Sequence, residues 1–403
     1  MKTHTPRAFF IDTNNAGIAG NALSGSQPAD SVRQCRKKFV QKSLRTYLPG
    51  MVCTVLLWVL LSTAAYADAA PKVIGGAIDL RNWNFSTQGK VTLSGNYGFF
   101  WNELLDTWKD PTDYVSVPGS WTNPKITNGR SYSSDGYATY ALRLLLPEGH
   151  ESLALYIKNH LVTVKCFANG VELVGYGNTG KGSKAVKVPC YLLPRDQTQV
   201  DILLQVHGRP HRDQGLYSVI TLDRTAVTAT QIVQDKTLAA MIFSFALALG
   251  LYHLILFIFR PKEVSILYFS LLVFIILLRI LSTDSLLGCD LFGFSWQTVV
   301  RLEYFTFATI SIPLVLYLRE LYRKYINKTV VMIWVGEGIL FGLITLVTSP
   351  AFFTSLVRFQ QIISLLEAGY LFYVIIVLVY KKEKEASFIA TGFAALMVTS
   401  VID

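Results

Sequence analysis

The densest group of polar side chains outside the strongly apolar part of the chain lies in VHGRPHRDQG, at Val206–Gly215. The side chains in this stretch that could do chemistry are His207, Arg209, His211, Arg212 and Asp213. A guanidinium offers paired N–H donors, so Arg209 or Arg212 could hold a carboxylate or the hydroxyls of a sugar. The stretch is therefore interpreted as a ligand-binding loop, with a solvated loop as the plainer alternative.

Other chemistry has less support in the sequence. A metal site made from His207, His211 and Asp213 is disfavoured, because Pro210 breaks the helical spacing that would put both histidines on one face. GYGNTGKGSK at Gly175–Lys184 lacks the spacing of a phosphate loop and is interpreted as a connection between strands. The chain contains no GxSxG or HExxH motif. We predict no catalytic residue, no metal and no cofactor.

Aromatic side chains give a second candidate for ligand binding. Trp101, Trp121, Tyr132 and Tyr137 could form a platform for a ring, although such residues also pack in cores and along strand edges. Asp135 lies among them and could accept hydrogen bonds from a ligand. The hypothetical ligand-binding residues are Trp121, Asp135, Tyr137, His207, Arg209 and Arg212.

Four charged residues occur inside apolar runs, where a charge at the bilayer centre costs roughly 2.5–3.5 kcal/mol. Arg279 could reach the membrane surface, or pair with Glu303 at a similar depth, with Asp284 as a local alternative. Glu337 and Glu367 fall near the middle of their runs. We interpret Arg279, Glu303, Glu337 and Glu367 as a hypothetical polar relay within the membrane. Hydrogen bonding that serves helix packing alone is the alternative.

The composition is that of a protein with both a membrane part and a water-soluble part. Of 403 residues, 51% are hydrophobic and 16% charged, with a mean hydropathy of +0.38. The net charge of +10 is concentrated before Met51 and in short loops between apolar runs, which indicates membrane topology and not nucleic-acid binding. Five cysteines form no CxxC pair, and the sequence leaves open whether Cys166 and Cys190 are joined.

The N-terminal segment has the pattern of an export signal. Residues 1–50 are predicted to be a disordered, basic leader, and residues 51–69 an apolar core followed by small residues. Cleavage after Ala67 or Ala69 is expected, because the apolar run is shorter than the roughly 20 residues of a membrane span. An uncleaved anchor is the alternative.

Residues 71–234 alternate between apolar and polar positions, as half-buried strands do. In QVDILLQVHG, one face carries Val200, Ile202, Leu204 and Val206. TVKCFANGVELVGYG predicts a hairpin, because Asn169-Gly170 favours a tight two-residue turn. This region is predicted to be an all-β sandwich resembling a jelly roll.

From Leu238 onward the chain is predicted to be a transmembrane helical bundle, at residues 238–402. Six apolar runs are near the length of a membrane-spanning helix: 238–259, 264–287, 302–318, 329–348, 356–380 and 386–402. The basic loops RPKE, RELYRKYINK and KKEKE follow the first, third and fifth runs, and the loops between are poor in lysine and arginine. The basic loops are expected to be cytoplasmic, which puts the β-domain outside.

Three stretches resemble a family of bacterial seven-transmembrane receptors with diverse intracellular signalling modules. They are VTLSGNYGFFWNELLDTWKDPTDYVSVPGSWTN, DGYATYALRLLLPE with the hairpin after it, and LLRILSTD with RLEYFTFATISIPLVLYLRELY. The likeness covers about residues 76–403. It implies an outer jelly-roll sensor similar to carbohydrate-binding domains, and spans that relay to an output such as a histidine kinase, a nucleotide cyclase, a diguanylate cyclase or a phosphatase. Only six runs are visible before Asp403, so the sequence is expected to be truncated before the seventh span and the output domain.

These observations predict the sensor part of a signal-transduction receptor in the plasma membrane. The receptor could belong to a two-component system. Its expected partners are a small external ligand, carbohydrate-like or acidic, and the lipid bilayer, with no nucleic acid and with a homodimer left open. The visible chain is not expected to be an enzyme, although a full-length form could carry a kinase or cyclase. The alternative is a transporter or membrane enzyme with an external recognition domain.

Overall fold

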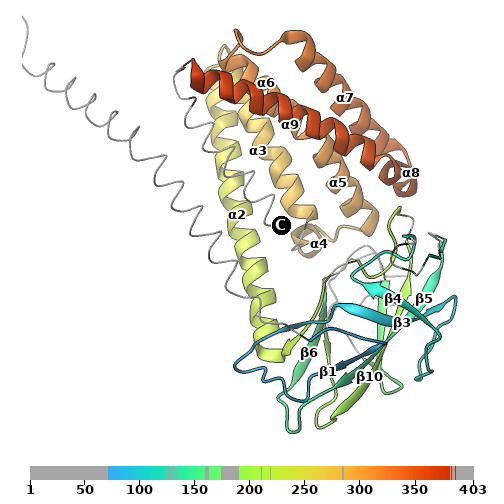
Figure 1. The fold of residues 1–403 in the computed structure, drawn as a ribbon. Helices are drawn as coiled ribbons and strands as arrows, with labels where there is room; N and C mark the ends of the chain where they lie inside the picture. The colour runs from blue at the N-terminus through green and yellow to red at the C-terminus, as the bar shows by residue number, and fades with distance from the viewer. Residues whose placement is uncertain are drawn as a thin grey trace, which may run out of the picture. The chain divides into compact units, whose positions relative to one another are not determined.

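The computed structural model describes residues 71–381 with gaps at 124, 126, 128, 131, 134, 159–162, 174–189, 210, 218 and 284–285, and also residues 383 and 386. Within this part, strands occupy the chain up to Arg224 and helices follow (Figure 1). The strands form two sheets, and the helices include five that are long and apolar enough to cross a membrane. The predicted order, a β-sandwich followed by a helical membrane bundle, is confirmed.

The larger sheet has the order β4-β3-β5-β10-β7-β8, and β1 pairs with β5 in parallel. Its strands are β1 (Ala77–Asp79), β3 (Gly95–Trp101), β4 (Asp113–Val117), β5 (Tyr137–Leu145), β7 (Thr163–Ala168), β8 (Val171–Leu173) and β10 (Gln199–His207). All other pairs in this sheet are antiparallel. Along each strand, successive side chains point to opposite faces of the sheet.

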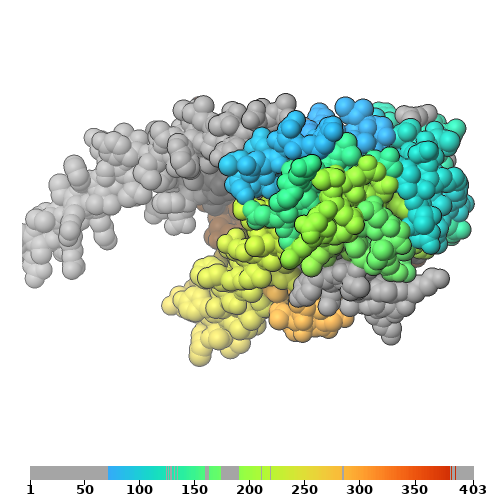
Figure 2. All heavy atoms as spheres, turned by 90° about the horizontal axis from the view of Figure 1, so that it is seen from below, coloured from blue at the N-terminus to red at the C-terminus, as the bar shows by residue number. Residues whose placement is uncertain are grey.

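The smaller sheet has the order β2-β11-β6-β9. Its strands are β2 (Val91–Thr92), β6 (Leu153–Ile157), β9 (Cys190–Leu192) and β11 (Ile220–Arg224). The core contains alternate residues of β10, namely Val200, Ile202, Leu204 and Val206, together with Leu155, Ile157, Ile220 and Leu222 from β6 and β11. The face of β10 predicted from its alternation is therefore the face that packs in the main core. On the surface of the molecule, segments distant in sequence pack side by side (Figure 2).

The predicted hairpin is confirmed, and its turn explains its sequence. β7 and β8 pair through Ala168 and Val171, which leaves Asn169 and Gly170 as the two turn residues. Both have positive φ, 47° and 83°, as this tight turn requires. The Asn169 side chain also accepts a 2.7 Å hydrogen bond from the Asp201 backbone, which ties the turn to β10.

The second face of the larger sheet is covered by the chain segment that follows β3. Phe100, Ala141, Phe167 and Leu203 form a small apolar cluster there, against which Leu105 and Trp108 pack. On the same face, Arg143 and Asp201 form two hydrogen bonds of 2.6 and 2.9 Å. The side chains of β10 that point away from the main core are therefore held by specific contacts as well as facing solvent.

The helices are α2 (Thr225–Phe259), α3 (Val264–Ser282), α4 (Leu287–Phe292), α5 (Trp296–Thr309), α6 (Ser311–Leu321), α7 (Lys328–Val347), α8 (Pro350–Ser355) and α9 (Val357–Tyr380). The spans are α2, α3, α5 with α6, α7 and α9. The second predicted run, 264–287, is longer than α3, because the helix ends at Ser282 and α4 begins at Leu287. The third, 302–318, is shorter than the helical segment Trp296–Leu321.

The third span is divided at Ile310, and Pro313 accounts for the division. Proline has no backbone N–H, so Pro313 cannot donate to the carbonyl of Thr309, and its ring crowds that carbonyl. α5 ends at Thr309 and α6 begins at Ser311. The hydroxyl of Thr309 donates a 2.7 Å hydrogen bond to the carbonyl of Phe305, so it is satisfied inside the helix.

The first span begins without a linker. β11 ends at Arg224 and α2 begins at Thr225, whereas the sequence places the end of the β-domain at residue 234. The Thr225 amide donates to the Ser152 carbonyl at 2.8 Å, and its hydroxyl lies 3.0 Å from the Ser152 hydroxyl. The last ten residues assigned to the sandwich therefore belong to the helix.

Several predictions fall outside the described residues: the leader at 1–50, the signal segment at 51–69, the loop at 175–184 and nearly all of the sixth run. Cys166 and Cys190 are free thiols in the structure. Burial raises the pKa of both thiols. The jelly-roll topology stays a prediction.

A substitution at Gly95 should destabilise the sandwich. Gly95 has φ +140°, and a Cβ there would lie 2.1 Å from the carbonyl oxygen of Val73. We expect Gly95→Ala to cost roughly 3 kcal/mol or more, because backbone must move. Gly149→Ala is the control: φ is +65° but nothing lies within 4 Å, so roughly 1–2 kcal/mol is expected. Thermal unfolding of the purified protein measures both, and equal midpoints would contradict the steric argument.

Candidate functional site

The loop that follows β10 is braced from inside by one fully buried side chain. Gln214 is 0% exposed, and its carboxamide oxygen accepts a 3.1 Å hydrogen bond from the Arg209 amide. Its side-chain nitrogen donates to the carbonyls of Arg209 and His211. The backbone of Gln214 is in turn held by Ser120, whose hydroxyl donates to the Gln214 carbonyl at 2.7 Å and accepts from its amide at 3.0 Å. Gln214 therefore ties Arg209 and His211 to the segment that contains Ser120.

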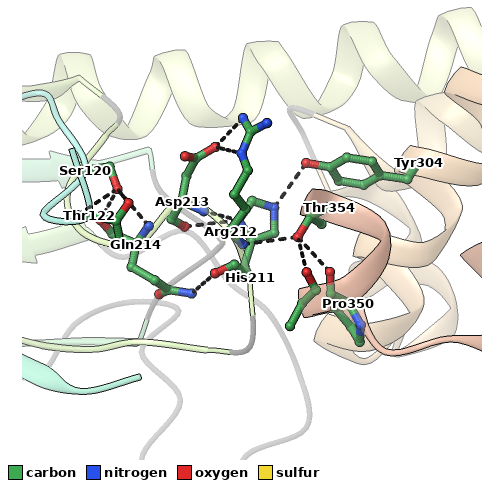
Figure 3. A network of polar contacts seen from close by, with 10 residues as sticks. Ser120, Thr122, His211, Arg212, Asp213, Gln214, Tyr304, Pro350 and Thr354 are labelled. Atoms are coloured by element: carbon green, nitrogen blue, oxygen red, sulfur yellow. Dashed lines mark hydrogen bonds and ion pairs between the residues drawn. The ribbon is translucent and has the colours of Figure 1, made fainter. Parts of the chain in front are cut away.

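Three residues of this loop contact the helices, and Figure 3 shows the contacts of two of them, His211 and Arg212. The His211 Nε2 atom lies 3.1 Å from the Tyr304 hydroxyl in α5, and the Arg212 amide donates to the Thr354 hydroxyl in α8 at 3.1 Å. The Arg209 guanidinium lies 5.4 Å from the ring centre of Trp296 at the start of α5. We call residues 208–215 the coupling loop, because this part of the predicted ligand-binding stretch contacts two helices, α5 and α8.

Burial controls the charge of His211. It lowers the pKa of this imidazole below its usual 6.5, and it outweighs Asp213 and Glu303, which favour the protonated form. A neutral imidazole has one donor and one acceptor nitrogen. Nδ1 lies 3.0 Å from the Asp213 carbonyl oxygen and 3.1 Å from the Asp213 amide, so it can donate to the first or accept from the second, and Nε2 then takes the other role toward the Tyr304 hydroxyl. The neutral form therefore fits both contacts.

The two arginines of the loop differ in their partners. Burial lowers the pKa of Arg209, whose guanidinium donates to the Thr163 hydroxyl at 3.3 and 3.1 Å. Arg212 pairs with Asp213 through Nε at 3.0 Å and Nη2 at 2.7 Å. The Nη1 atom of Arg212 is buried and has no hydrogen-bond partner among the described residues. Arg212 therefore keeps an unused donor.

A second connection runs through α2. Its 35 residues span about 52 Å at 1.5 Å per residue, more than the roughly 30 Å of a hydrocarbon core. The polar first part, residues 225–237, therefore extends beyond the apolar run that starts at Leu238. Lys236 pairs with Asp290 of α4 at 2.6 Å. The sandwich is therefore continuous with α2, and the Lys236–Asp290 ion pair ties α2 to α4 just before the apolar run of α2 begins.

The hypothetical ligand-binding residues differ in burial and in their partners. Trp121 is 0% exposed and donates to the Ser133 carbonyl at 3.0 Å. Asp135 is exposed, and its amide bonds to the Ser133 hydroxyl at 3.2 Å. Tyr137 and His207 are paired across β5 and β10, with ring centres 5.7 Å apart. Arg209 and Arg212 lie in the coupling loop.

The aromatic platform is part of a packed cluster. The ring centres of Trp101 and Trp121 lie 5.3 Å apart, and those of Trp101 and Tyr132 lie 4.9 Å apart. Phe99 contacts Tyr132 at 5.2 Å within the same group. Trp121 belongs to the main core, and Trp101 and Tyr132 pack against it. Packing, the alternative considered for these residues, accounts for all three.

Within the spans, Arg279 and Glu303 come together as the sequence suggested, although through the backbone. Arg279 Nη1 donates to the carbonyl oxygen of Glu303 at 3.3 Å, which joins α3 to α5. Asp284 lies outside the described residues. Arg301 makes a similar contact that the sequence did not suggest, because its Nη1 donates to the carbonyls of Thr345 and Leu346 at the end of α7. A cation at a helix C-terminus is favoured by the helix dipole.

Glu337 and Glu367 form part of one polar cluster. Glu337 in α7 lies beside Gln360 in α9, and Glu367 lies beside Ser311 in α6. Gln360 and Glu367 are 1% and 4% exposed. One oxygen of each, and one of Glu337, is buried without a hydrogen-bond partner among the described residues. The cluster connects three helices at a place where polar groups are costly to bury.

No group of three histidine, cysteine or acidic side chains suited to a metal ion occurs among residues the structure describes. His207 and His211, the pair considered from the sequence, have different surroundings: the first lies at the end of β10 and the second contacts α5.

The fold and these contacts define a membrane protein with a β-sandwich ahead of apolar helices. Residues 235–403 match the family model described as 7TM diverse intracellular signalling. No curated protein matches the chain.

Solved structures similar to the chain include β-glucuronidases. That of Ruminococcus gnavus is 12% identical with a TM-score of 0.26, covering 33% of this chain and 27% of the enzyme. That of Faecalibacterium prausnitzii is 12% identical with a TM-score of 0.26, covering 33% of this chain and 31% of the enzyme. The chain thus spans less than a third of these enzymes, and the likeness is too weak to support an argument about function.

The sequence did not identify the residues that receive the coupling loop, or the residue that braces the loop from inside. Tyr304, Thr354 and Gln214 carry no motif, and the first two are 93 and 142 residues away from their partners. The signals are a tyrosine inside the third apolar run and a threonine in the loop between the fourth and fifth runs, and many such residues serve packing alone.

Acidification should weaken the structure through His211. Because its pKa is lowered in the folded protein, the unfolded chain takes up the proton first, so stability is full above about pH 6.5 and falls as the pH decreases below that value. We expect the thermal midpoint to drop between pH 7.5 and 5, and to drop less in His211→Asn. His150→Asn, at a partly exposed histidine outside the coupling loop, is the control. The same pH profile in both variants and the wild type would contradict this role.

Proposed function

We propose that the chain is the sensor part of a transmembrane signalling receptor. The sandwich binds a small ligand on the outer side of the plasma membrane, and the helices pass the change to a cytoplasmic output such as a histidine kinase or a cyclase. The match of residues 235–403 to a signalling family supports the receptor class. The ligand, the orientation and the output are inferences.

The observation that carries the proposal is the position of the coupling loop. It begins directly after β10, the central strand that pairs with β5 and β7, and its residues contact α5 and α8. A ligand that moves β10 or the loop would therefore change contacts with two helices. Such a ligand shifts the equilibrium between helix arrangements by its difference in affinity for them.

Two features support transmission inward from there. β11 continues into α2 without a linker, so a rotation of the strand moves the helix. Deeper in the bundle, the cluster of Glu337, Gln360 and Glu367 joins helices through incompletely paired polar atoms. Unpaired buried polar atoms are costly, so a second helix arrangement that pairs them would offset the cost of moving the helices, which suits a relay.

Charge supports the orientation. Arg260 and Lys262 follow α2, Arg323 and Lys324 follow α6, and Lys381 follows α9. Since alternate helix ends lie on one side of a membrane, these basic ends share a side, which is the cytoplasmic one by the positive-inside rule. The sandwich joins α2 at its other end, which supports an outer position for it.

A labelling experiment tests the orientation. Val171 in the hairpin is 66% exposed, and Lys262 lies in the loop between α2 and α3. In spheroplasts treated with a membrane-impermeant maleimide, we expect Val171→Cys to be labelled at once and Lys262→Cys only after permeabilisation. The unsubstituted protein corrects for the native cysteines. The reverse pattern would place the sandwich in the cytoplasm.

A ligand screen combined with hydrogen exchange tests the function. The purified protein is screened by thermal shift against sugars, amino acids and organic acids. We expect any ligand that raises the midpoint to change amide exchange in α7 and α9 as well as in the sandwich. Tyr304→Phe should reduce the change in the helices, because it removes the hydroxyl that contacts His211. Tyr380→Phe, at an 81% exposed residue of α9, is the control. Changes confined to residues 71–224 would contradict the proposal.

A further inference from the structure

A cavity of about 590 Å³ lies beside the coupling loop. Its lining comes from three parts of the chain: the segment after β4, with Ser120, Thr122 and Lys125; the coupling loop, with Arg212 and Asp213; and the start of α9, with Arg358. Figure 3 shows four of these residues around Gln214. The volume is within the range of roughly 300–1,000 Å³ that small-molecule sites occupy.

The cavity has an excess of positive charge. Lys125, Arg212 and Arg358 face it with one carboxylate, that of Asp213. Asp213 is already paired with Arg212, so Lys125 and Arg358 are left, and neither forms an ion pair within the part of the chain described. An anion in the cavity would satisfy both cations, and charge-assisted hydrogen bonds are the strong ones.

The donors in the cavity also suit an anion. The Nη1 atom of Arg212 is buried without a hydrogen-bond partner among the described residues, so it has a donor to offer. The hydroxyls of Ser120 and Thr122 also line the cavity, but their protons are already used: Ser120 donates to the Gln214 carbonyl, and Thr122 lies 2.8 Å from the Ser120 oxygen and donates to it. Leaving a buried guanidinium donor unpaired is costly, and a carboxylate or phosphate oxygen would remove that cost.

We propose that this cavity is the ligand site of the receptor, and that it binds a small anion carrying carboxylate or phosphate groups between Lys125 and Arg358. The inference rests on the proposed function and gives it a ligand class. Lys125 belongs to the sandwich and Arg358 to α9. Two cations repel each other when the site is empty, and a bound anion draws them together, which favours one arrangement of the sandwich segment and the helix.

The anion could come from two sources. Arg358 is the second residue of a span, at the depth where phospholipid headgroups lie. An acidic lipid headgroup and a soluble anion share the chemistry that the site recognises. The test therefore needs one arm in neutral lipid and one arm in acidic lipid.

The first arm uses the purified protein in phosphatidylcholine nanodiscs, titrated with citrate or inorganic phosphate at constant ionic strength. We expect the thermal midpoint to rise by several degrees on binding. Lys125→Gln and Arg358→Gln should each weaken the apparent affinity by roughly tenfold, the loss expected for a hydrogen bond to a charged group. Lys90→Gln and Arg195→Gln remove the same charges at exposed residues outside the cavity, and should bind as the wild type does.

The second arm uses nanodiscs with phosphatidylglycerol. If the headgroup is the anion, the midpoint is higher in these discs, citrate adds nothing, and Arg358→Gln removes the difference. The proposal is overturned if no anion changes the midpoint in either lipid, or if the cavity variants respond as the wild type does. A response that needs Lys125 and Arg358 but leaves exchange in α7 and α9 unchanged would support the site and contradict the receptor function. If a sugar or amino acid changed exchange in the helices while citrate, phosphate and acidic lipid had no effect, the receptor function would be supported and the anion site contradicted.

Discussion

The direct passage of β11 into α2 is the constraint on which the rest of the structure depends. A strand and a membrane-spanning helix that share adjacent residues cannot move independently, because no flexible segment separates Arg224 from Thr225. The Thr225 contacts with Ser152 add hydrogen bonds at the same point. The coupling loop then provides a second attachment, to α5 and α8, so that the sandwich is connected to the helices at two places.

The helices combine the requirements of lipid with points of weakness. Hydroxyl groups inside the spans, such as those of Ser244 and Thr345, donate to the carbonyl four residues earlier and leave no polar atom facing lipid. The helix is interrupted at Ile310, and one oxygen each of Glu337 and Glu367 is unpaired among the described residues, so hydrogen bonding is incomplete at these places. They lie on α5, α6, α7 and α9, four of the helices that make up the candidate spans.

The sequence predicted what depends on local pattern. Alternation in β10 and the Asn169-Gly170 turn were enough for the sandwich, since side-chain period and turn conformation are local properties. Loop charges and apolar length were enough for the spans. The pairing of His211 with Tyr304 joins residues 93 positions apart, and the end of the sandwich at Arg224 depends on a helix that starts in polar sequence. Trp121 shows the same limit, because burial decides between packing and binding and cannot be known from residue type.

Amide hydrogen exchange across the passage from β11 to α2 tests the central claim most directly. In the intact protein in nanodiscs, the peptide covering residues 222–237 should exchange as slowly as the helical residues after it, because its amides are hydrogen-bonded in a continuous element. Rapid exchange in that peptide, with protected strands before it and a protected helix after it, would show a flexible hinge. The sandwich and the first span would then move independently, which would contradict rigid coupling between them.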